Sequence, residues 1–129
     1  MPKGIAQEDP LGCGIACVAY MIKQSYKETK CRYFKSCSAN ISGYLCRDLV
    51  NALAAAKRDY SYKHLNKRMM FRNGTIVFIK RSKRYPYGHY LVKTLHGWMD
   101  PWINLPALQP QSGFRKRLPG KPIYAVFPK

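Results

Sequence analysis

The chain has 129 residues, of which 23 are Lys or Arg and six are Asp or Glu, so its formal net charge at pH 7 is +17. This length can bury one hydrophobic core without metal or disulfide support, and we expect a single domain over residues 1–129. No stretch approaches the ~20 apolar residues of a membrane span, and the N-terminal residues lack the apolar segment of a signal peptide, which predicts a cytoplasmic protein.

Two helices are predicted in the first half of the chain. Apolar residues recur near helical spacing from Cys13 to Gln24, and a second apolar face, rich in Leu and Ala, runs from Ser42, a potential cap, to Lys57. The basic residues 25–38 between them are predicted to be irregular.

The second half of the chain has the pattern of strands. In chain order, the predicted strands cover residues 60–62, 75–80, 90–95, 97–100 and 123–127. Residues 105–120 are rich in Pro, Gly, Gln and basic residues, and they are predicted to form a long loop that covers one edge of a cleft. Helices followed by strands indicate an α+β fold with a small antiparallel sheet.

Cys13 lies where the first helix is expected to begin, because Pro10 and Gly12 interrupt regular structure just before it. At a helix N-terminus the unpaired N–H groups and the helix dipole favour the thiolate, which is the reactive form of cysteine. Gln7, six residues earlier, carries an amide that could donate to an oxyanion. Cys17, one turn after Cys13, is expected to be an inert core residue.

A reactive cysteine needs a base, and His89 has the best setting among the three histidines. It follows Gly88 and opens the apolar run of a predicted strand. Asp100 ends the next predicted strand, and an acid in that apolar setting is a candidate partner for the base, although it could also pair with a nearby Arg or Lys. Acyl transfer by a nucleophile requires these residue types.

The register of the hairpin that begins at His89 decides whether His89 and Asp100 can contact each other. If residues 93–96 form a four-residue loop, His89 lies opposite Asp100, with Cβ atoms roughly 5 Å apart. A two-residue turn at positions 96–97 would instead place Asn104 opposite His89. A catalytic triad is therefore expected to require the wider loop.

The order and spacing of these motifs resemble a known family, the papain-like cysteine peptidases that process double-glycine leader peptides in bacteriocin exporters, and their stand-alone relatives. That family carries Gln, then Cys-Gly-x-Ala at a helix start, then a Gly-His-aromatic strand, then Asp-Pro at the end of the next strand. In this chain the motifs fall on Gln7 and on residues 13–16, 88–90 and 100–101.

The resemblance implies a papain-like fold, with the N-terminal nucleophile helix packed on the sheet. It also implies a peptide or protein substrate, no cofactor, and assigned roles for four residues. Cys13 would be the nucleophile, His89 the general base and acid, Asp100 the orienting carboxylate, and Gln7 an oxyanion donor beside the Cys13 backbone N–H. The chain departs from the family in its strongly basic charge.

Metal binding is another possible use of the cysteines. Five cysteines, an odd number, argue against a closed disulfide framework and fit a reducing compartment, although Cys31 and Cys37 could pair if oxidised. Cys13 and Cys17 are spaced i, i+4, but no second pair has the tight spacing of structural zinc sites, so no metal site is predicted.

The basic charge leaves a second class of function open. Ten of the 23 basic residues fall between Lys57 and Arg84, and tyrosines are interleaved with them. Such a field attracts anionic partners, which could be nucleic acid, an acidic protein or peptide, or a membrane surface. The alternative to a peptidase is thus a basic binding module for nucleic acid or an acidic protein on a papain-like scaffold. Another thiol acyl transfer, such as deamidation or transglutamination, is also open.

Overall fold

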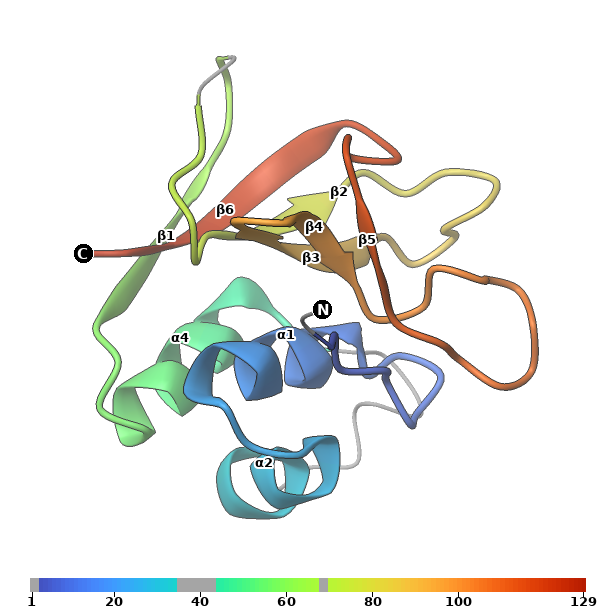
Figure 1. Ribbon diagram of the computed structural model, residues 1–129. Coiled ribbons are helices and arrows are strands. Elements are labelled where there is room, and N and C mark those ends of the chain that lie inside the picture. Colours follow the sequence, from blue (N-terminus) through green and yellow to red (C-terminus); the bar gives the residue numbers. More distant parts are fainter. Residues whose placement is uncertain (1–2, 35–43, 68–69) are drawn as a thin grey trace.

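The computed structural model describes residues 3–34, 44–67 and 70–129. Within these residues, three helices lie on one side of a six-stranded antiparallel sheet (Figure 1). The helices are α1 (Cys13–Ile22), α2 (Tyr26–Tyr33) and α4 (Cys46–Ala55). The strands are β1 (Tyr60–His64), β2 (Ile76–Ile79), β3 (His89–Thr94), β4 (Gly97–Asp100), β5 (Gly113–Arg115) and β6 (Pro122–Pro128), in the spatial order β1-β6-β2-β3-β4-β5.

The central helix α1 lies between the sheet and α2, with α4 beside it (Figure 1). Its middle turns, from Ile15 to Ala19, have no exposed surface, so nearly the whole circumference of the helix is packed. Cys17 belongs to this core, and burial raises the pKa of its thiol well above the usual value. The prediction that Cys17 is a buried core residue is confirmed.

The two faces of the sheet are both covered by apolar side chains. Along β3, Tyr90 and Val92 join the helices in the main core, whereas Leu91 packs with Trp98 in a second cluster on the opposite face. Because side chains alternate along a strand, His89 projects to the same face as Leu91. The candidate base therefore starts a strand that is buried on both sides.

α2 replaces part of the stretch that was predicted to be irregular. Ser25 Oγ accepts a hydrogen bond from the Glu28 N–H at 3.1 Å and donates to the Glu28 carboxylate at 3.0 Å, so Ser25 caps the N-terminus of this helix. This Ser-x-x-Glu signal was present in the sequence and was missed. The predicted second helix is confirmed as α4, whereas the proposed cap at Ser42 and the potential disulfide partner Cys37 lie outside the described residues.

The long loop predicted over residues 105–120 contains β5, which pairs with β4 at the edge of the sheet. A strand of three residues carries too little pattern to stand out in a sequence, and its pairing with β4 defines it. In the described parts of the chain, no helix has the length and apolar character needed to cross a bilayer.

Candidate active site

His89 and Asp100 lie side by side on β3 and β4, with 2.7 Å between His89 Nε2 and Asp100 Oδ1. Both residues are buried, and Asp100 has no exposed surface. Since Nε2 is bonded to the carboxylate, Nδ1 is the ring nitrogen left for a second partner. The second group that interacts with the imidazole is Cys13, which contributes to the raised pKa of His89.

The register of the hairpin differs from both predicted registers. Thr94 pairs with Gly97 across a two-residue turn, so the predicted four-residue loop and the turn predicted further along are both wrong. The Thr94 hydroxyl stabilises this turn by donating to Gly97 O at 2.8 Å and accepting from the His96 N–H at 3.0 Å. In this register His89 and Asp100 are diagonal neighbours on one face, and long polar side chains reach across that diagonal.

Asp100 also pairs with an arginine, an alternative that the sequence had left open without identifying the residue. Its Oδ2 accepts a hydrogen bond from Arg115 Nε at 2.7 Å, and its Oδ1 accepts one from the Trp102 N–H at 2.9 Å. Burial alone would raise the Asp100 pKa, but the hydrogen bonds from His89 and Arg115 outweigh it and lower the pKa to about 2. Arg115 lies on β5, so no sequence signal connected it with Asp100.

His89 is held on several sides. The ring of Tyr85 stacks on the imidazole with 4.8 Å between centroids and 14° between planes. Burial lowers the His89 pKa, but the hydrogen bonds to Asp100 and Cys13 raise it to about 9. The preceding Gly88 has φ +77°, and a Cβ there would lie 2.2 Å from the Phe78 ring, so only glycine fits before the histidine.

Cys13 is half-buried, and its sulfur lies against the first residues of β3, where the Tyr90 N–H donates to Sγ at 3.4 Å. The first hydrogen bond of α1 runs from the Ala16 N–H to Gly12 O at 3.1 Å, so the Cys13 N–H precedes the helical ladder. A Cβ at Gly12 would lie 1.9 Å from the Tyr26 hydroxyl, so glycine there allows α2 to approach the start of α1.

Gln7 is buried next to the end of β4, where its backbone N–H donates to Pro101 O at 3.1 Å. Its side-chain Nε2 donates to Asp9 O at 3.0 Å and to Pro10 O at 3.1 Å, and its Oε1 is buried without a hydrogen-bond partner among the described residues. Both amide hydrogens are thus engaged with the loop that leads to Cys13. An oxyanion would have to replace one of these two carbonyl acceptors.

The loop between Gln7 and Cys13 is anchored by α2. The Asp9 carboxylate accepts a hydrogen bond from the Tyr26 hydroxyl at 2.6 Å and pairs with Lys30 Nζ at 2.9 Å. Burial raises the Asp9 pKa, but the hydrogen bonds from Tyr26 and Lys30 lower it overall. The helix that was missed in the sequence therefore positions the segment that carries the candidate oxyanion donor.

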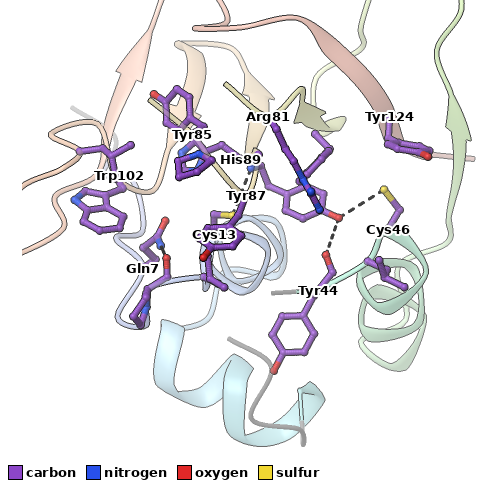
Figure 2. A pocket seen from close by; sticks show the side chains of 18 of the residues that line it. Gln7, Cys13, Tyr44, Cys46, Arg81, Tyr85, Tyr87, His89, Trp102 and Tyr124 are labelled. Atoms are coloured by element: carbon purple, nitrogen blue, oxygen red, sulfur yellow. Dashed lines mark hydrogen bonds between the residues drawn. The ribbon is translucent and has the colours of Figure 1, made fainter. Parts of the chain in front are cut away.

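A pocket of about 720 Å³ opens over these residues and is lined by Gln7, Cys13 and His89, with Asp100 buried behind the histidine. In Figure 2, Trp102 lies near Gln7 on one side of Cys13, and Tyr44, Cys46 and Tyr124 lie on the other. The rest of the aromatic wall consists of Tyr62, Phe78, Tyr85, Tyr87 and Tyr90. Among the residues that the structure describes, no group of three or more His, Cys, Asp or Glu side chains is placed to hold a metal ion.

Neither a protein-family model nor a curated protein matches this sequence. Among solved structures, the chain is similar to the peptidase domain of Streptococcus ComA, a bi-functional ABC transporter involved in a quorum sensing pathway. The two superpose with a TM-score of 0.60 at 19% sequence identity, over 98% of each chain. The chain has the papain-like peptidase fold. The α+β fold predicted from the motifs is thus confirmed, including the packing of the Cys13 helix on the sheet.

The ion pair of His89 and Asp100 predicts a window of pH in which it stabilises the fold. The raised His89 pKa contributes stability that is complete below pH 6.5 and lost as the pH rises towards about 9. The lowered Asp100 pKa contributes stability that is complete above pH 3.8 and lost as the pH falls towards about 2. In urea unfolding, the stability difference between wild type and His89→Gln should therefore shrink above pH 6.5, by up to about 1.4 kcal/mol per pH unit. A difference that stays constant from neutral pH to pH 9 would contradict this assignment.

Proposed function

We propose that this protein is a cysteine peptidase in which Cys13 is the nucleophile and His89 the general base and acid. The observation that carries the proposal is that Cys13 and His89 line one pocket as interacting neighbours, with Asp100 hydrogen-bonded to His89 behind them. Asp100 keeps Nδ1 of the imidazole directed at the sulfur and stabilises the imidazolium. The fold shared with a peptidase domain supports peptide-bond hydrolysis over other acyl transfers of a thiol.

In the proposed reaction the Cys13 thiolate attacks the carbonyl carbon of a peptide bond. The oxyanion accepts hydrogen bonds from the Cys13 N–H and from Gln7 Nε2, which gives up one of its loop carbonyls. The His89 imidazolium donates its proton to the leaving amine, and a thioester remains on Cys13. His89 then takes a proton from water, and the resulting hydroxide attacks the thioester carbon. The C–S bond breaks, the acyl part leaves as a carboxylic acid, and the Cys13 thiolate and His89 imidazolium are restored.

The proposed substrate is a peptide or the leader segment of a peptide precursor, as the resemblance to the leader-processing family implies. The ends of the pocket on either side of Cys13 (Figure 2) would accommodate an extended chain whose scissile bond lies at the sulfur. The aromatic walls suit apolar side chains on that chain.

Labelling with a peptidyl acyloxymethyl ketone tests the nucleophile. We expect Cys13 to react about 10²-fold faster than Cys31. Of these two described cysteines, Cys13 is the one with a base beside it, and general-base catalysis contributes at least a factor of this size. Cys31 is the matched comparison, since it is a free, exposed cysteine of the same chain. Cys46 should react slowest of the three, because it is buried and burial raises its pKa.

Rates are read by mass-spectrometric mapping of the modified residue. His89→Ala should slow the labelling of Cys13 and leave that of Cys31 unchanged. Equal rates at Cys13 and Cys31 in the folded wild type would refute the proposal.

A further inference from the structure

Three arginines line the pocket and come from two segments of the chain, α4 and the connection from β2 to β3. Arg47 belongs to α4, Arg81 follows β2, and Arg84 lies in the connection from β2 to β3. All three are exposed, and Arg81 extends into the pocket in Figure 2. The described residues that line the pocket include no Asp or Glu. The pocket therefore presents positive charge that no carboxylate of its wall balances.

The positive charge also lacks compensation from neighbouring residues. Among the described residues, the ion pairs involve Lys30, His89, Arg115 and Lys129, and none of the three pocket arginines. Among the described residues, the polar and cation–π contacts of Arg84 are with a carbonyl, Ile103 O at 3.4 Å, and with the face of the Tyr85 ring at 5.5 Å. Asp100 is engaged with His89 and Arg115 and has no exposed surface to offer.

We propose that this pocket selects acidic peptides, with Asp or Glu side chains near the scissile bond bound by Arg47, Arg81 and Arg84. This inference rests on the peptidase function proposed above. A guanidinium donates two parallel hydrogen bonds to a carboxylate, so arginine is well suited to recognise such side chains. The arginines line the same concave, aromatic pocket as the candidate nucleophile, which fits a peptide inserted into the site better than a polyanion bound along an open surface.

Binding measured on the Cys13→Ala protein tests the selectivity without turnover. The probe is a pool of short fluorescein-labelled peptides made of Glu, Leu, Ala and Gly, and its twin pool contains Gln in place of Glu. Each exposed ion pair contributes little to the binding free energy. We therefore expect the three arginines together to make the Glu pool bind about tenfold more tightly than the Gln pool at physiological salt. Fluorescence anisotropy gives both affinities.

A triple substitution, Arg47→Gln, Arg81→Gln and Arg84→Gln, should abolish the preference for Glu over Gln. The control, Lys116→Gln, Arg117→Gln and Lys121→Gln, removes the same number of positive charges from exposed residues that do not line the pocket. It should keep the preference. Equal binding of the two pools, or an equal loss in both triple variants, would overturn the proposal. The proposal would also be overturned if the pocket triple variant lost more affinity for a single-stranded RNA probe than for the Glu pool.

The same pools separate this inference from the proposed function. If wild type cleaves neither pool while Cys13→Ala prefers the Glu pool, the peptidase proposal fails and the acidic selectivity stands. If wild type cleaves both pools with the same kcat/KM, the peptidase proposal stands and the selectivity fails.

Discussion

Replacing Cys13 with alanine should lower kcat/KM for peptide hydrolysis by about 10⁶-fold, the scale on which a serine protease loses activity without its nucleophile. No described thiol is placed to substitute for it. Cys17 is fully buried inside the core, and Cys46, although it lines the pocket, is buried and takes its hydrogen bond from Tyr90 at 3.6 Å. The assay follows cleavage of a peptide by chromatography under saturating and limiting substrate.

The control for this variant is Cys31→Ala, which makes the same change at an exposed residue of α2. It should retain wild-type kcat/KM. Cys13 is half-buried at the first position of α1, so its replacement should leave the melting temperature nearly unchanged. A Cys13→Ala protein that keeps a substantial share of wild-type turnover would exclude this residue as the nucleophile.

His89→Ala should cause a loss on the same scale, about 10⁶-fold, because nucleophile and base act as one unit and the loss of either disables both. The loss should not come from unfolding. Asp100 keeps its ion pair with Arg115 and its hydrogen bond from the Trp102 N–H, so removal of the imidazole does not leave the buried carboxylate without partners.

The matched control is His96→Ala, which changes an exposed histidine at the turn of the same hairpin. We expect it to retain activity. Circular dichroism melting of both variants monitors the fold. If His89→Ala and His96→Ala lose activity equally, or if His89→Ala loses activity only because it melts at the assay temperature, the general-base assignment is wrong.

Local signals in the sequence accounted for much of the fold. The start of α1 at Cys13 follows from the break at Pro10 and Gly12 and the apolar periodicity after it, which are both properties of neighbouring residues. The bounds of β4, residues 97–100, agreed with the prediction. α2 was missed although its Ser25 N-cap is a local signal, because the stretch was interpreted as irregular and basic.

The sequence by itself therefore determined the class of fold, the helix that begins at Cys13 and the identity of the candidate residues. The tertiary structure decided how they meet. The diagonal contact of His89 with Asp100 depends on the turn, where a shift in pairing changes which residues face one another. Arg115 reaches Asp100 only because β5 pairs with β4, and the hydrogen bonds of the Gln7 amide depend on how its loop packs. Such contacts join residues that are distant in the chain, and side-chain packing selects them where no local pattern can.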